Sequence, residues 1–203
     1  MKVALIGATG RGGSCILSEL VSRGHAVTAI ARHAEKVPAL DGVTARQGDV
    51  LDGPATSELL RGHDAAISAV QFVPIDSGTL IEAVKASGVL RFLVMGGAGG
   101  LETVPGVKLI NSPEFPPEYR AEASKAISFL NLLKQEPALD WTFLSPAALI
   151  EPGERTGTFR LGGDQLLTDA QGNSRVTFED YAIAMVDELE RHAHPRQRFS
   201  VAY

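Results

Sequence analysis

A run of seven residues near the N-terminus, Gly7-Ala8-Thr9-Gly10-Arg11-Gly12-Gly13, constrains the fold of this chain more than any other feature. It follows the short apolar run 3–6, which is typical of a strand buried on both faces. Residues 11–22 then carry a helical stripe of apolar side chains. Glycines in such a strand–turn–helix unit allow a tight turn and a close approach of the backbone to a ligand. Because the helix N-terminus adds free N–H groups and a positive dipole end, the unit predicts a site for a dinucleotide pyrophosphate.

The same alternation of strand and helix continues along the chain and predicts an α/β fold with a Rossmann-type, doubly wound parallel sheet. We expect one NAD(P)-binding domain over residues 1–203, with a small hairpin and helix near its C-terminal end. The expected strands are 3–6, 26–31, 43–47 (near an edge), 65–70, 91–95, 141–144 and 199–201. The expected helices are 11–22, 54–60, 79–87, 118–134 and 178–191, and the hairpin joins 165–167 to 175–177.

Two stretches interrupt this alternation. Residues 96–117 lack periodicity and contain four prolines, and residues 146–177 contain several glycines. Long aperiodic insertions in a compact domain are usually functional or mobile. Both follow the carboxyl ends of expected strands, where open α/β sheets bind ligands, so we expect both on the substrate side.

The residues after the second expected strand indicate which nucleotide binds. An NAD site places Asp or Glu there for the ribose hydroxyls, whereas this chain has Ala31-Arg32-His33. Arg32 can pair with a 2′-phosphate through its guanidinium fork, and Arg11 can add a second contact. The sequence therefore predicts NADP(H) in preference to NAD(H).

Further cofactor contacts are expected at two other strand ends. Asp49 can accept a hydrogen bond from an adenine amino group, and the small residues after the fourth strand let a ribose lie against the backbone. The predicted cofactor-binding residues are Gly7, Thr9, Gly10, Arg11, Gly12, Gly13, Arg32, Asp49, Val50, Ala69 and Val70.

These motifs together resemble those of a known superfamily. The turn Gly7–Gly13, then Arg32, then Gly48-Asp49-Val50, is similar to the atypical short-chain dehydrogenase/reductases. The runs WTFLSP at 141–146, EPGERTG at 151–157 and FEDYA at 178–182 resemble the NADH-flavin reductase-like branch, which is related to biliverdin reductase B. The resemblance covers nearly the whole chain and implies a Rossmann sheet with the cofactor across its switch point.

The usual catalytic set of that superfamily is absent. It consists of a Ser after the fifth strand and a Tyr-x-x-x-Lys on the next helix, but residues 95–100 read Met-Gly-Gly-Ala-Gly-Gly. The nearest candidates are Tyr119 and Lys125, which are six residues apart and therefore roughly 240° apart around a helix. A tyrosine without a nearby cation is a poor acid at neutral pH, so they remain weak catalytic candidates.

An acceptor that needs hydride but little help with protons fits this pattern. Flavins and quinones are such acceptors, because their reduced anions are delocalised. We expect an NADPH-dependent reductase that places the nicotinamide against a planar acceptor. Two alternatives stay open: a non-catalytic NADP(H)-binding redox sensor, and an NAD(P)-dependent epimerase or dehydratase in which Tyr119 and Lys125 converge. The expected acceptor lining is Phe72 to Pro74, Phe115 to Pro117 and Ala147 to Ile150.

Composition limits the classes of partner and ligand that this chain is expected to bind. A net charge of −5 and a pI near 5.5 argue against nucleic acid. The lone Cys15 excludes an intramolecular disulfide, and the five histidines show no metal-ligand spacing. No apolar run approaches bilayer length and no signal-peptide pattern is present, so we expect a cytoplasmic protein that does not bind membranes. The sequence leaves the oligomeric state open.

Glu179 and Asp180 begin the expected helix 178–191, and we interpret them as acids that favour a helix start.

Overall fold

A central sheet of eight strands runs in the order β10-β12-β8-β5-β4-β1-β2-β3 in the computed structural model, which describes residues 1–203. All neighbouring strands are parallel except β10, which is antiparallel to β12. From β1 the chain builds outward to β2 and β3, and then crosses back to place β4 on the other side of β1. The switch point between β1 and β4 is where such sheets bind ligands.

The elements have the following bounds. The strands of the main sheet are β1 (Lys2–Ile6), β2 (Ala26–Ala31), β3 (Val43–Gln47), β4 (Ala65–Ser68), β5 (Arg91–Met95), β8 (Asp140–Ser145), β10 (Arg160–Gly162) and β12 (Gln197–Ala202). The short strands β6 (Glu102–Val104) and β7 (Val107–Lys108) pair with each other, as do β9 (Leu149–Glu151) and β11 (Arg175–Thr177). The helices are α1 (Arg11–Ser22), α2 (Gly53–Leu60), α3 (Ser77–Ser87), α4 (Arg120–Lys134) and α5 (Phe178–Arg191).

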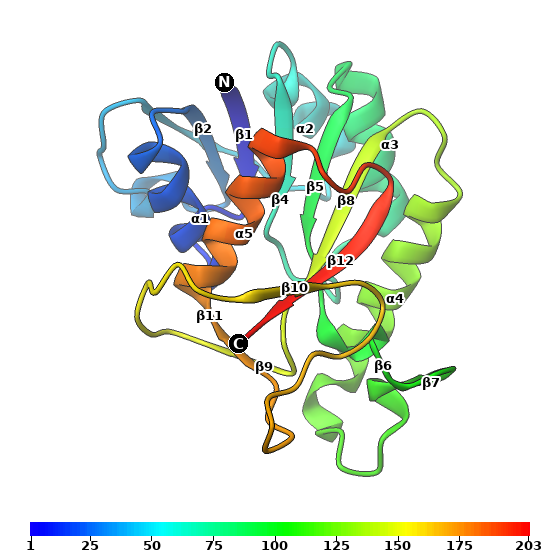
Figure 1. Ribbon diagram of the computed structural model, residues 1–203. Helices are drawn as coiled ribbons and strands as arrows, with labels where there is room; N and C mark the ends of the chain where they lie inside the picture. The colour runs from blue at the N-terminus through cyan, green and yellow to red at the C-terminus, as the bar shows by residue number, and fades with distance from the viewer.

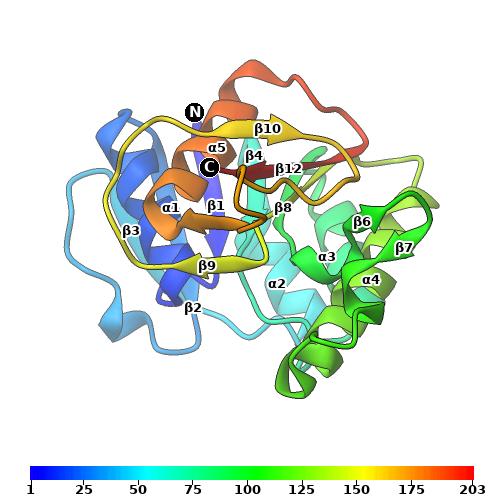
Figure 2. The same cartoon turned by 60° about the horizontal axis from the view of Figure 1, so that its bottom comes forward.

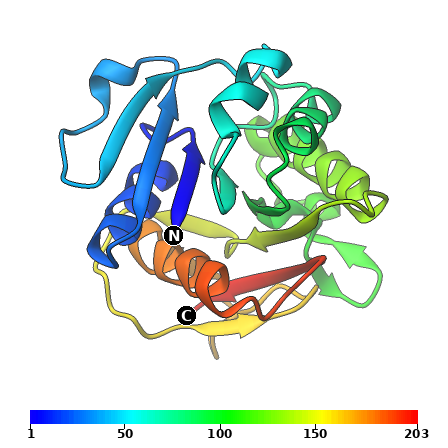
Figure 3. The ribbon, with the colours of Figure 1, turned by 90° about the horizontal axis from the view of Figure 1, so that it is seen from above.

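Helices cover both faces of the sheet. Helices α1 and α5 pack together on one face, and α2, α3 and α4 lie on the other (Figures 1 and 3). The apolar stripe of α1 at Ile16, Leu17 and Leu20 is fully buried against the sheet and α5. Burial of each such side chain contributes about 1.5–3 kcal/mol, so the stripe fixes the helix that follows the glycine turn.

The structure confirms the Rossmann-type sheet, including the edge position of β3, but it corrects one detail. The expected hairpin between 165–167 and 175–177 is wrong. The turn at its centre exists, because the Asp169 carboxylate accepts hydrogen bonds from the Gln171 and Asn173 amides. Its two arms pair elsewhere, however: β11 lies parallel to β9, and Gln165 bridges to Glu102. Long-range pairing therefore overrides the local turn.

The two insertions meet at the carboxyl ends of the strands, at the bottom of Figure 1. Strand β6 hydrogen-bonds to the second insertion, since the Glu102 amide donates to the Asp164 carbonyl at 2.9 Å and the Leu166 amide donates to the Glu102 carbonyl at 2.8 Å. Figure 2 shows β6, β7, β9 and β11 on this side of the molecule. The two expected substrate-side segments, residues 96–117 and 146–177, are thus connected to each other. None of the helices combines the length and the hydropathy needed to cross a membrane.

Candidate functional site

The turn after β1 can be formed only by glycine at its first position. Gly7 has a φ of +83°, and a Cβ added there would lie 2.7 Å from the carbonyl oxygen of Ala69 at the end of β4. The Gly7 amide donates to the carbonyl of Ile30 on β2 at 2.9 Å. The turn is therefore held between the carboxyl ends of β2 and β4, at the switch point of the sheet.

Two further glycines bring α1 close to the turn. A Cβ on Gly13 would lie 2.1 Å from the Gly7 carbonyl oxygen, and a Cβ on Gly12 would lie 2.4 Å from the Met95 sulfur. Real Cβ atoms do not approach other atoms so closely, and because the Gly7 carbonyl is backbone, position 13 requires glycine, whereas the Met95 side chain could move away from a Cβ at position 12. Gly10 differs, because a Cβ there would meet its nearest neighbour at an acceptable 3.4 Å.

The first turn of α1 presents unpaired hydrogen-bond donors. The amides of Arg11, Gly12 and Gly13 have no acceptor within the protein, and the first helical bond is donated by Ser14 to the Gly10 carbonyl at 2.8 Å. Gly10 provides no side-chain cap, and the first turn contains no acidic residue. Free amides and the positive end of the helix dipole make this a site for an anion.

Two arginines close to this site have no partner. Arg32 follows β2, whose residue Ile30 accepts the Gly7 amide, and Arg11 begins α1. Both side chains are exposed, and neither forms an ion pair or a side-chain hydrogen bond in the structure. His33, next to Arg32, instead contacts Glu35 at 3.1 Å. Both guanidinium groups are therefore free to bind a phosphate.

The other predicted cofactor contacts also lie at the carboxyl ends of strands. Ala69 and Val70 directly follow β4 and are partly exposed, and Asp49 and Val50 follow β3. One Asp49 carboxylate oxygen accepts the Leu51 amide at 3.0 Å and so stabilises its own loop. The second oxygen has no partner, and its proposed bond to adenine stays a prediction.

Met95 ends β5 and Gly96 follows it, at the place where the superfamily resemblance implies a serine. A Cβ on Gly96 would lie 2.1 Å from the Phe143 ring, so no larger residue fits there. Tyr181 lies nearby, but its hydroxyl donates to the Leu144 carbonyl at 2.7 Å and is completely buried. Burial raises the pKa of Tyr181 well above its usual value, which makes it unsuitable as a proton donor.

Tyr119 directly precedes α4 and Lys125 lies within it, and the two side chains do not contact each other. Tyr119 ends a 3-10 helix at Pro117–Tyr119 that precedes α4, and its side chain is exposed. Lys125 lies within α4, exposed to solvent and near Asp76, where its charge contributes to a lowered pKa of that carboxyl after the hydrogen bonds from Thr79. The structure holds no tyrosine–lysine pair of the type that the superfamily uses.

Some of the expected acceptor lining belongs to the core. Phe72 is 4% exposed and packs edge-on against Phe129, with the ring centres 5.3 Å apart, so its expected role as lining is wrong. Ala147 is also buried, at 2% exposure. Val73 is half exposed, and Phe115 is partly exposed beneath the Arg120 guanidinium, 5.6 Å from its ring centre. The apolar surface available to an acceptor is therefore smaller than the sequence suggests.

Sequence reasoning missed a carboxylate on α4. Glu122 accepts hydrogen bonds from the backbone amides of Phe72 and Val73, at 2.6 and 2.9 Å. Nothing in the sequence relates residue 122 to residues 72 and 73, since the contact arises only when the segment after β4 meets α4 in the folded chain.

The interpretation of Glu179 and Asp180 as acids that favour the helix start is incomplete. Thr177 caps α5 by accepting the Asp180 amide. The two carboxylates hold the segment 151–157 instead: Glu179 accepts the Gly153 amide at 2.9 Å, and the fully buried Asp180 accepts the Gly157 amide at 2.8 Å. The EPGERTG and FEDYA motifs are thus two halves of one structural contact.

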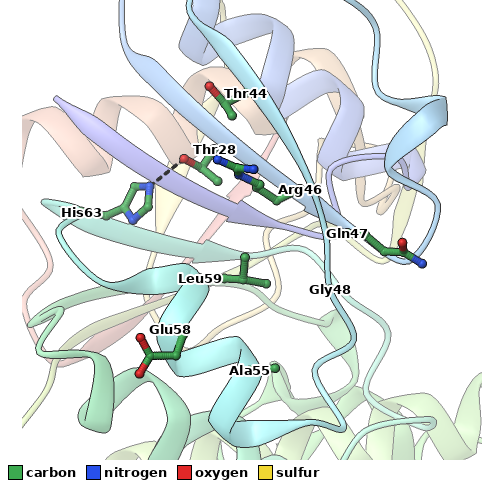
Figure 4. A pocket seen from close by; sticks show the side chains of 9 residues that line it. All are labelled: Thr28, Thr44, Arg46, Gln47, Gly48, Ala55, Glu58, Leu59 and His63. Carbon is green, nitrogen blue, oxygen red and sulfur yellow. Dashed lines mark hydrogen bonds between the residues drawn. The ribbon is translucent and has the colours of Figure 1, made fainter.

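A polar groove of about 690 Å³ lies apart from the glycine turn, between edge strand β3 and α2. Figure 4 shows its residues, with the His63 ring bonded to the Thr28 hydroxyl at 2.7 Å. It is lined by Thr28, Thr44, Arg46, Gln47, Gly48, Ala55, Glu58, Leu59 and His63. The groove contains none of the predicted cofactor-binding residues, although its Gly48 directly precedes Asp49. No three His, Cys, Asp or Glu side chains anywhere lie close enough together to hold a metal ion.

Comparison with known proteins agrees with this geometry. Residues 7–192 match the family model described as NAD(P)H-binding. A solved structure from Bacteroides thetaiotaomicron, described as a "putative epimerase", is 42% identical, with coverage of 100% of this chain and 96% of that chain and a TM-score of 0.95. One from Burkholderia pseudomallei, described as a "putative exported protein", is 41% identical over 100% of both chains, with a TM-score of 0.90. One from Streptococcus pneumoniae TIGR4, described as "a putative NADH-flavin reductase", is 37% identical over 100% and 99% of the chains, with a TM-score of 0.87. The expected cytoplasmic location stays a prediction.

Proposed function

The chain belongs to the NAD(P)H-binding family and is an NAD(P)-dependent oxidoreductase in general, and we propose that it uses NADPH to reduce a flavin or a quinone-like acceptor. One observation carries this proposal: three free backbone amides, at Arg11, Gly12 and Gly13, lie at the same end of the sheet as Arg32, whose side chain has no partner. The three amides fit a pyrophosphate, and the Arg32 guanidinium fits a 2′-phosphate.

The residues present fit a phosphorylated dinucleotide. Gly7 and Gly13 let the turn pack against Ala69 and let α1 pack against the turn, which brings the free amides of α1 to the end of the sheet. No carboxylate follows β2 at the position of Arg32 to repel a 2′-phosphate or to bind the ribose hydroxyls of NAD. These features favour NADPH over NADH.

The cofactor supplies the hydride, and the protein supplies position. In this proposal the free amides of α1 would hold the pyrophosphate, and the segment after β4 would help to position the nicotinamide end. Val73 in the segment after β4 and Phe115 in the first insertion offer exposed apolar surface, which suits a planar acceptor. Solvent can supply the proton, because the reduced flavin or quinone anion is delocalised.

Turnover separates this function from binding alone. The test mixes the protein with NADPH and, in turn, FMN, FAD and a benzoquinone, and follows the absorbance of the reduced nicotinamide. The proposal predicts consumption that is faster with NADPH than with NADH and that depends on the acceptor. Tight NADPH binding without consumption across the panel would support a redox sensor instead.

An epimerase is the second candidate, because the Bacteroides thetaiotaomicron protein is described in those terms. An epimerase of this superfamily would need an acid–base pair, and the candidates in this chain are Tyr119 and Lys125. Tyr119 is exposed on the short helix before α4 and contacts no cation in the structure. A Tyr119→Phe variant that loses activity would favour the epimerase over the reductase.

A further inference from the structure

We propose that Glu122 is a positioning residue for hydride transfer, fixing from α4 the segment 69–73 that follows β4 and borders the nicotinamide end of the cofactor site. This proposal rests on the proposed function and deepens it. It concerns a residue that does not touch the reacting atoms but sets where the backbone around them lies.

The contact uses the whole carboxylate of Glu122. One oxygen accepts the Phe72 amide at 2.6 Å, and the other accepts the Val73 amide at 2.9 Å. Neither amide has a backbone partner, and Glu122 forms no ion pair with any cation. Hydrogen bonds to an ionised carboxylate are about twice as strong as neutral ones, so α4 holds this loop firmly.

The segment is also fixed at its other end, by the glycine turn. The Ala69 amide donates to the Ile6 carbonyl at 2.9 Å, and the Ala69 carbonyl lies against Gly7. Val70 and Gln71 lie between the two anchors and are partly and fully exposed, respectively. A dinucleotide that extends from the α1 amides toward the end of β5 must cross this segment, because β4 lies between β1 and β5.

Packing alone does not set the backbone position of the segment. The Phe72 ring lies in the core against Phe129 and Phe143, with ring centres 5.3 and 6.2 Å away, but Val73 is half exposed and Pro74 is exposed. The Glu122 carboxylate therefore fixes the backbone at residues 72 and 73, where side-chain packing of the exposed Val73 and Pro74 does not. Hydride transfer needs reacting atoms held about 3–3.5 Å apart, and a 1 Å misplacement can cost about 100-fold in rate.

The test compares Glu122→Gln with the matched control Glu118→Gln. Glutamine preserves the shape of Glu122 but turns an N–H toward one of the two amides, which leaves that amide without an acceptor. Glu118 is exposed in the same region, on the short helix before α4, and its side chain makes no hydrogen bond or ion pair. Amide hydrogen exchange of the peptide covering 69–76, NADPH affinity by calorimetry, and steady-state reduction of FMN are measured for each protein.

We expect exchange in the 69–76 peptide of Glu122→Gln to be about tenfold faster than in the wild type. We expect kcat to fall about tenfold, while the dissociation constant for NADPH changes by less than about threefold, because an aligning residue acts on the reaction more than on binding. Glu118→Gln should match the wild type in all three measurements.

Unchanged exchange or unchanged kcat in Glu122→Gln would overturn the proposal. A fall in kcat matched by faster exchange throughout the protein would also overturn it, since that pattern reports general destabilisation. A wild-type protein that reduces no acceptor would refute the proposed function instead. Protection of 69–73 by NADPH, lost in Glu122→Gln, would still show that Glu122 positions the segment against the cofactor, and absence of that protection would refute this as well.

Discussion

Arg32 is the residue on which the predicted choice of NADPH over NADH depends, and its replacement by alanine gives a sharp test. The guanidinium is exposed, pairs with nothing, and follows the strand whose Ile30 carbonyl holds the glycine turn. Removing it leaves the fold intact, because no intramolecular contact is lost. Any effect on binding therefore reports the interaction with the nucleotide.

The size of the effect follows from the exposure of Arg32. A 2′-phosphate carries about −1.5 to −2 charges at neutral pH by analogy with other phosphate monoesters. Hydrogen bonds to charged groups contribute about 1.5–3 kcal/mol, while exposed ion pairs contribute about 0–1 kcal/mol. A bidentate contact at an exposed site lies between these ranges, at about 1.5–2 kcal/mol. Arg32→Ala should then weaken NADPH binding about 10- to 30-fold.

Calorimetric titration with NADPH and with NADH measures both affinities. NADH lacks the 2′-phosphate, so its affinity should change less than about twofold in Arg32→Ala. Arg46→Ala is the matched control, because Arg46 is also exposed and unpaired but lies in the polar groove beside α2. Equal weakening of both nucleotides by Arg32→Ala, or an equal loss of NADPH affinity in Arg46→Ala, would refute the specific contact.

Three further predictions concern the turn, the epimerase alternative and the segment 151–157. Gly13→Ala should lower the midpoint of thermal unfolding by about 6–12 °C, from an overpacking cost of about 3 kcal/mol, because the new Cβ would lie 2.1 Å from a carbonyl oxygen. Gly163→Ala, where nothing lies within 4 Å, should leave the midpoint unchanged, and an equal loss in both would contradict this reading of Gly13. Tyr119→Phe should retain the FMN reductase rate. If Tyr119 acted as a general acid, the substitution would lower the rate about 100-fold or more. Arg155 hydrogen-bonds Glu19 twice at 2.9 Å and lowers the pKa of Glu19. A depressed folded pKa means that the pair stabilises above the unfolded value of about 4.3 and loses this effect as the pH falls through the folded value. In urea unfolding, Arg155→Ala should therefore cost about 0.5–1 kcal/mol at pH 7 and nothing in strong acid, and a cost independent of pH would contradict the assignment.

The sequence predicts the cofactor side of the molecule well, because that side is built from consecutive residues. The strand–turn–helix unit at 3–22 is local, and two of its glycines, Gly7 and Gly13, are required by close contacts with backbone. Arg32 and Asp49 could be located because parallel strands place their carboxyl ends at one edge. The contacts of these residues with a nucleotide, and the choice of NADP(H) over NAD(H), stay predictions.

The acceptor side depends on contacts between distant residues, which periodicity does not reveal. Glu122 and Phe72 are 50 residues apart, and the ring of Phe72 faces the core rather than the acceptor. Glu188 near the end of α5 is a similar case, because it is 3% exposed and pairs with the distant Arg91 at 2.8 Å. Buried charges must be paired, but the sequence does not tell which acidic residue will be buried.

The amides of Arg11, Gly12 and Gly13 provide the most direct test of the dinucleotide site. In a proton–nitrogen correlation spectrum recorded during titration with NADPH, these three resonances should shift together and saturate, since a pyrophosphate would give each its first hydrogen-bond acceptor. Resonances that stay fixed up to millimolar NADPH in folded protein would contradict the site, and with it the reductase function proposed for this chain.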